Sequence, residues 1–95
     1  MAAYVIADID IHDPEGYEDY RTRVPATITA YGGRYLARGG AITPLEGDWE
    51  PQRLAVLEFE SSEAALAWYR SEEYRPLLAI RQATATSKLV LVEGL

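Results

Sequence analysis

The chain contains 95 residues, the length of one small domain, and we expect residues 1–95 to fold as a single domain. Its 15 acidic and 9 basic residues give a formal net charge of -6, which repels nucleic-acid phosphates and anionic lipid headgroups, so neither is an expected partner. The lack of cysteine excludes disulfides, iron–sulfur clusters and thiolate zinc sites, and it is typical of a cytoplasmic protein. No stretch of the sequence approaches the ~20 apolar residues that a membrane span needs.

The N-terminal segment alternates between two faces and predicts a strand from Ala3 to Ile11. One face holds Val5, Ala7, Ile9 and Ile11, and the other holds Tyr4, Ile6, Asp8 and Asp10. A helix is expected next, because Asp13 is a favourable N-cap and Pro14 is favourable at the first helical position. Its inward stripe would comprise Tyr17, Tyr20, Arg21 or Val24, Ile28 and Tyr31.

A proline lies inside this predicted helix. Pro25 has no N–H to donate to the carbonyl of Arg21, a loss of about 3 kcal/mol. We therefore expect a kink between Thr22 and Pro25, partly offset by packing. The pair Gly32-Gly33 then ends the helix, because glycine takes a left-handed conformation without steric penalty.

Two strands and a long connection are expected in the middle of the chain. The second strand runs from Arg34 to Arg38 and is broken by Gly39-Gly40, and the third runs from Arg53 to Glu60. The segment between them, AITPLEGDWEPQ, contains two prolines and a glycine. It predicts a bent hairpin or a projecting loop in which Trp49 is the one large apolar anchor.

The C-terminal third predicts two helical pieces and a last strand. The first helix runs from Glu63 to Arg70 and is capped by Ser61 or Ser62. Ser71 is a fresh N-cap, and a short helix from Leu77 to Gln82 follows Pro76. The connector ATATS then leads to a fourth strand from Lys88 to Glu93.

The order strand, helix, strand, strand, helix, strand predicts an α+β fold of the split βαβ type, with an antiparallel four-stranded sheet and both helices on one face. The uncovered face would carry Tyr4, Ile6, Val56, Val90 and Val92. So much apolar surface needs a cover, and we therefore expect a homodimer that pairs through the sheet.

Several segments resemble a known family over essentially the whole chain. They are Tyr31–Gly40, Leu45–Trp49, Leu57–Phe59, Ala64–Tyr69, Ser71–Tyr74, Arg81 and Val92–Gly94. They are similar to the small bacterial family called domain of unknown function 1330, within the dimeric α/β-barrel superfamily. The resemblance implies a ferredoxin-like βαββαβ subunit whose sheet closes with that of its partner into a barrel. Relatives in the superfamily include cofactor-independent monooxygenases of aromatic polyketides, muconolactone isomerases and haem-binding enzymes, with ligands usually between sheet and helices.

Aromatic and charged side chains supply the main candidate site. The candidates are Tyr17, Tyr20, Arg38, Glu46, Trp68, Tyr69, Tyr74 and Arg81. Tyrosine and tryptophan offer stacking surface with a hydrogen-bonding group, and arginine can hold a carboxylate or phenolate. These residues predict a pocket for a small aromatic or carboxylated ligand that needs neither a metal nor an organic cofactor. In an enzyme, Tyr20 or Tyr69 would bind a substrate oxygen, Arg81 or Arg38 would stabilise negative charge, and Glu46 or Asp8 would move a proton.

The alternative is a non-catalytic stress-related or interaction module. In that case the aromatic residues fill the core, and the arginines pair with Glu46, Glu58 or Glu72.

Other constellations are weaker. Asp8, Asp10 and His12 fall on one side of the first strand and could bind a metal, but they equally end the strand and begin the helix. Haem would require His12 as its axial ligand. Arg34 is expected to pair with Asp8 or Glu58 in the barrel interior, unless all three are solvated at a strand end. No serine lies in a G-x-S-x-G motif, and the glycines do not form G-x-G-x-x-G.

Overall fold

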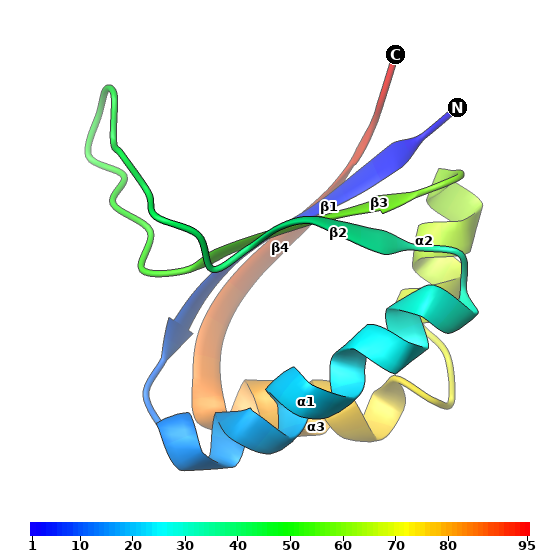
Figure 1. The fold of residues 1–95 in the computed structure, drawn as a ribbon, viewed down its shortest axis with the longest axis horizontal. Coiled ribbons are helices and arrows are strands. Elements are labelled where there is room, and N and C mark those ends of the chain that lie inside the picture. The colour runs from blue at the N-terminus through cyan, green and yellow to red at the C-terminus, as the bar shows by residue number, and fades with distance from the viewer.

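Strands and helices follow one another in the predicted order in the computed structural model, which describes residues 1–95 (Figure 1). The elements are β1 (Ala3–Ile11), α1 (Pro14–Ala30), β2 (Arg34–Arg38), β3 (Leu54–Phe59), α2 (Ser62–Tyr69), α3 (Arg75–Thr84) and β4 (Ala85–Glu93). None of the helices is both long enough and apolar enough to span a membrane.

The four strands form one antiparallel sheet in the order β2-β3-β1-β4. The three helices lie on one side of this sheet, whereas the segment between β2 and β3 and both chain ends extend away on the other side (Figure 1). This arrangement confirms the predicted ferredoxin-like βαββαβ fold with helices on one face. A register shift between Tyr35 and Ala37 places a bulge in the edge strand β2.

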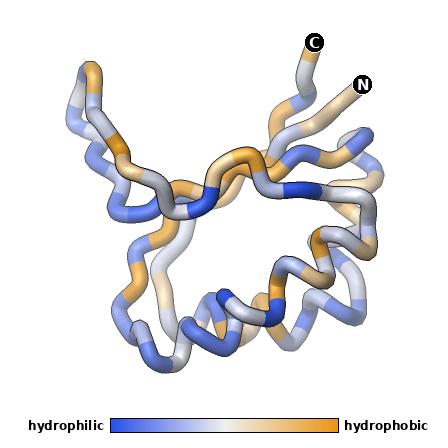
Figure 2. Tube along the Cα trace, viewed as in Figure 1, coloured by the Kyte–Doolittle hydropathy of each residue, from blue (hydrophilic) through white to orange (hydrophobic).

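Alternation decides which side of each strand meets the helices. Val5, Ala7 and Ile9 of β1 are almost fully buried, and their neighbours in the strand are not. The same pattern buries Leu57 and Phe59 of β3. Figure 2 shows hydrophobic residues along the central strands, as expected for a sheet packed against helices on one face.

Helix α1 begins and ends as predicted. The Gly16 N–H donates to Oδ1 of Asp13 at 3.2 Å, so Asp13 is the N-cap. At the other end Gly32 adopts φ 77°, and the N–H groups of Gly32 and Gly33 donate to the carbonyls of Thr29 and Ile28. This is a Schellman motif. Of the predicted inward stripe, Tyr17, Tyr20, Val24 and Ile28 are buried, Tyr31 is partly buried and Arg21 is exposed.

Helix α1 continues through Pro25 to Ala30. The Arg21 carbonyl, which has no helical donor from Pro25, accepts a hydrogen bond from the Arg38 guanidinium of β2. The missing helical bond is thus replaced by a tertiary one.

The C-terminal helices differ from prediction in their bounds. Ser61 caps α2 by accepting from the Ala64 N–H, and the Ser71 hydroxyl accepts from the Tyr74 N–H in the turn before α3. Helix α3 is longer than predicted, and the expected connector ATATS is wrong, because β4 begins at Ala85 immediately after the helix. The Thr84 carbonyl accepts the N–H groups of His12 and Asp13, which ties this junction to the end of β1.

The sheet face opposite the helices is uncovered in the subunit. Tyr4, Ile6 and Val56 are only partly buried there, and Val90 and Val92 are 60% and 46% exposed, as predicted. The β2–β3 loop projects on this side (Figure 1). Trp49 was expected to anchor the loop by burial, but it is 58% exposed and instead donates from Nε1 to Oδ2 of Asp8 at 2.9 Å.

Candidate functional site

A narrow cavity lies between the helix-facing side of the sheet and the helices. Its volume is about 30 Å³, far below the roughly 150 Å³ of a cavity that can hold benzene. Apolar side chains of β1, β3 and α1 form most of its wall, including Val5, Ile9, Val24 and Leu57. In the ligand-free subunit the space is therefore nearly filled by the protein's own side chains.

The charged part of this wall is entirely cationic. Arg21, Arg38, Arg53 and Arg81 line the cavity, and no aspartate or glutamate does. Arg81, in the last turn of α3, is only 3% exposed, and its Nε has no hydrogen-bond partner. A buried charge normally has a counter-charge and a full set of hydrogen bonds, so Arg81 is an exception that requires a cause.

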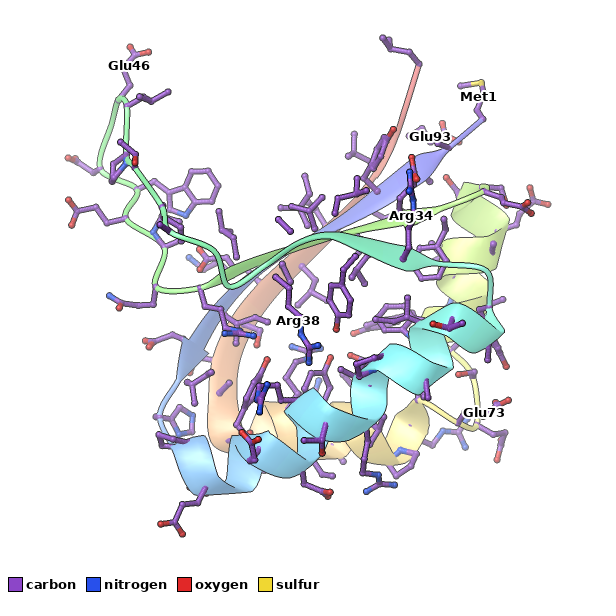
Figure 3. The ribbon with its side chains drawn as sticks, viewed as in Figure 1. Met1, Arg34, Arg38, Glu46, Glu73 and Glu93 are labelled. Atoms are coloured by element: carbon purple, nitrogen blue, oxygen red, sulfur yellow. The ribbon has the colours of Figure 1, made fainter.

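Two of the arginines lie at the β2–β3 end of the cavity. Arg38 points from β2 toward the helices (Figure 3), and its guanidinium carbon lies 4.8 Å from the centre of the Tyr35 ring. The bond to the Arg21 carbonyl holds it there. Arg53 is packed against Gly39, where a Cβ atom would lie 2.5 Å from its Nη1, so a larger residue at position 39 would displace it.

Aromatic side chains form a rigid wall beside Arg81. The hydroxyl oxygens of Tyr20 and Tyr74 are 2.7 Å apart and joined by a hydrogen bond. The ring centroids of Tyr74 and Trp68 are 4.3 Å apart. Trp68 donates from Nε1 to Oγ1 of Thr27 at 3.0 Å. Because each ring has a packed neighbour and a bonded polar atom, the wall is preorganised.

The tyrosines of the cavity stay protonated at neutral pH. Burial raises the pKa of Tyr20 far above its usual value, and the neighbouring Tyr74 raises it further. Burial also raises the pKa of Tyr17, against the opposing effect of Arg53, and that of Tyr35. For Arg81, burial lowers the pKa, but the Tyr74, Tyr20 and Tyr69 phenols outweigh it, so the pKa is raised and the side chain remains charged.

The structure brings most of the predicted site residues together. Tyr17, Tyr20, Arg38, Trp68 and Arg81 line the cavity. Tyr74 is fully buried and bonded to Tyr20, and Tyr69 is 36% exposed, with its ring centre 5.8 Å from that of Tyr74.

The two predicted proton-transfer residues lie elsewhere. Glu46 stands at the tip of the projecting β2–β3 loop (Figure 3), and Asp8 is on the uncovered sheet face, bonded to Trp49. The prediction that Glu46 lies beside the cavity depends on topology alone, which does not fix the direction of a 15-residue loop. The cavity can hold an anion and donate hydrogen bonds, but no carboxylate lines it to act as a base.

Sequence reasoning missed two cavity residues, Tyr35 and Arg53. Tyr35 follows Arg34 directly in β2, and successive residues of a strand face opposite sides of the sheet. This alternation could have identified Tyr35 as a cavity residue. Arg53 is predicted as the first residue of the third strand, but in the structure it precedes the first residue of β3.

The weaker constellations are also placed. Arg34 pairs with Glu58 at 2.7 Å, as predicted, and points away from the helices (Figure 3). Asp8 does not join this pair. His12 is exposed beyond the end of β1, and no group of three or more histidine, aspartate or glutamate side chains is arranged to hold a metal ion.

The fold defines a class, the ferredoxin-like βαββαβ domains. Within that class, the family model "Domain of unknown function (DUF1330)" matches residues 2–95, so this chain belongs to that family. No curated protein matches the chain in sequence.

Solved structures share the fold at low sequence identity. A protein of unknown function from Rhodopseudomonas palustris aligns with a TM-score of 0.81 at 20% identity, over 99% of this chain and 82% of that one. SnoaB, a cofactor-independent oxygenase from Streptomyces nogalater, aligns with a TM-score of 0.72 at 15% identity, over 99% and 93%. A putative antibiotic biosynthesis monooxygenase from Nitrosomonas europaea gives 0.61 at 13%, over 99% and 90%.

Proposed function

We propose that this protein binds a small aromatic or carboxylated molecule between its sheet and its helices, without a metal or an organic cofactor. One observation carries the proposal: Arg81 is 3% exposed, its Nε is unpaired, and no acidic residue lines the cavity. A bound anion would supply the missing acceptor and counter-charge.

The surrounding residues support the same ligand chemistry. Tyr17 and Tyr20 are protonated phenols, which can donate hydrogen bonds to a ligand oxygen. Trp68 and Tyr35 present aromatic rings on which a flat ligand can stack. Together they suit an oxygen-bearing anion attached to an apolar or aromatic body.

Catalysis by this cavity would have a restricted form. Arg81 and Tyr20 would stabilise negative charge that develops on a substrate oxygen. Because no carboxylate lines the cavity, the substrate would have to ionise in water or lose its proton to solvent. That chemistry fits a cofactor-independent oxygenase, and SnoaB is described as one. This reaction class is therefore the first to test.

In this proposal the protein is a cytoplasmic homodimer. The uncovered sheet face presents Val90 and Val92, and a second copy would remove them from water. The lack of cysteine supports a reducing compartment.

A second candidate is an interaction module with a filled core. The cavity volume of about 30 Å³ favours it, since an aromatic ligand would enter only if side chains moved. In this version Arg81 is a structural residue and the functional surface lies elsewhere.

Thermal unfolding with added ligands separates the two candidates. Benzoate, 4-hydroxybenzoate and 4-phenylbutyrate at millimolar concentration should raise the Tm of the wild type, because ligands that bind only the folded state stabilise it. The variant Arg81→Gln should lose this shift, and Arg34→Gln, which changes an arginine on the opposite sheet face, should keep it. If no acid shifts the wild-type Tm, the filled-core module is correct.

A further inference from the structure

Two buried polar atoms of this protein have no hydrogen-bond partner, and the residues that carry them line the same pocket. They are Nε of Arg81 and Oγ of Ser87. The pocket lies where α3 passes into β4, adjoins the cavity described above through Arg81 and Leu89, which line both, and has a volume of about 400 Å³. Unpaired buried polar atoms are uncommon in folded proteins, so two in one pocket indicate a common missing partner.

The backbone explains why both side chains reach this pocket. Arg81 is in the last turn of α3, and β4 begins at Ala85 with no connector between them. Alternation along β4 then turns Ala85, Ser87 and Leu89 toward the helices, and Thr86 and Lys88 toward the other face. Ser87 therefore lies on the same side of the sheet as Arg81.

Both unpaired atoms can donate a hydrogen bond. The Nε–H of arginine can only donate, and the serine hydroxyl can donate as well as accept. No acidic residue lines the pocket, so the charge of Arg81 has no balance there. The missing partner is thus an anion that offers acceptor oxygens in two directions, which a carboxylate does.

An apolar groove continues from this pocket along the edge strand β4. It lies between α2 and β4, has a volume of about 230 Å³, and is lined only by hydrophobic residues, among them Val5, Leu66 and Leu91. Tyr69 and Leu89 border both the groove and the pocket. A dry cavity of about 150 Å³ can hold benzene, so the groove has room for a ring with a short chain.

We propose that the protein binds an apolar monocarboxylate at the edge of β4, with its carboxylate between Arg81 Nε and Ser87 Oγ and its aryl or alkyl tail in the groove beside Tyr69 and Leu89. This inference rests on the proposed binding function: it keeps Arg81 as the residue that binds the anion, but places the rest of the ligand in the pocket and groove at the edge of β4 and not in the cavity. It adds Ser87, which no sequence pattern singles out, as a binding residue.

The first test is titration calorimetry with 4-phenylbutyrate as the probe. Wild-type protein should bind it, and Ser87→Ala should bind about tenfold more weakly, since it loses one hydrogen bond to a charged group. The control Ser62→Ala removes a hydroxyl that donates to Glu93 on the surface and should bind like the wild type. Two matched probes test the ligand class: 4-phenylbutanol lacks the charge, acetate lacks the tail, and each should bind at least tenfold more weakly.

A second measurement needs no substitution. In a nitrogen-15 spectrum, the Arg81 Nε–Hε signal should move when 4-phenylbutyrate is added, and the Arg34 signal should not. If the wild type binds the acid but Ser87→Ala binds it equally well, the proposed position is wrong while the ligand-binding function stands. If the alcohol binds as tightly as the acid, the ligand class is wrong. If no carboxylate binds the wild type, both proposals fail.

Discussion

Replacing Arg81 by methionine should make the ligand-free protein more stable. Arg81 is buried with an unpaired Nε and no carboxylate beside it, an arrangement that costs free energy in the folded state. Methionine has a similar length, no charge and enough flexibility to fill the same space. The substitution therefore removes a desolvation cost and keeps the packing.

The size of the effect follows from the contacts. One unsatisfied buried donor costs about 1–3 kcal/mol, and more when it is charged. The Tyr74, Tyr20 and Tyr69 phenols near Arg81 outweigh the effect of burial on its pKa, so the expected gain comes from the unpaired Nε. We expect Arg81→Met to raise the unfolding free energy by about 1–3 kcal/mol, which for a chain of this length raises the Tm by at least about 4 °C.

Urea denaturation at pH 7, followed by tryptophan fluorescence at fixed protein concentration, measures this directly, since Trp68 is 1% exposed. The control is Arg21→Met, which changes an exposed arginine paired with Glu18 and should alter stability by less than about 0.5 kcal/mol. A loss of 1 kcal/mol or more in Arg81→Met, relative to this control, would show that Arg81 supports the fold and would refute the reasoning.

Three further predictions concern pH, assembly and the end of α1. The unfolding free energy should fall as pH rises above 10, because the pKa values of Tyr17, Tyr20 and Tyr35 are raised in the folded state and the unfolded chain releases these phenolic protons first. In urea titrations, Tyr20→Phe should reduce the dependence of the unfolding free energy on pH by up to about 1.4 kcal/mol per pH unit. An unchanged dependence would contradict the raised pKa of Tyr20. Val90→Glu should convert the proposed homodimer into a monomer in sedimentation experiments, since it places a charge on the uncovered sheet face. A wild type that already sediments as a monomer would disprove this. Gly32→Ala should cost about 1 kcal/mol, measured by thermal unfolding, because Gly32 has φ 77°; a neutral substitution would show that the turn can rearrange.

The sequence predicted the fold well where side chains carry a clear period or a clear stop. The nine residues of β1 alternate, and Gly32 and Gly39 stop α1 and β2 where predicted. The start of β4 was missed because Ala85, Thr86 and Ser87 are small or polar and resemble a connector. Their strand conformation comes from pairing with β1, which no local pattern reveals.

The candidate site was predictable in type but not in detail. The aromatic and arginine residues could be assigned to one face of the sheet from the topology, and most of them lie there. The direction of the β2–β3 loop could not be predicted, so Glu46 was misplaced. Whether an arginine has a partner depends on three-dimensional contacts, and this is why neither the isolation of Arg81 nor the role of Ser87 was visible in the sequence.

The distribution of charge between cavity and surface has a consequence for ligand selection. Four of the nine basic residues line the cavity, whereas all fifteen acidic residues lie outside its lining. An approaching anion therefore meets a repulsive outer field before it reaches the arginines. Molecules with several negative charges are turned away more strongly than those with one, and added salt, by screening the exterior, should speed the association of a singly charged ligand.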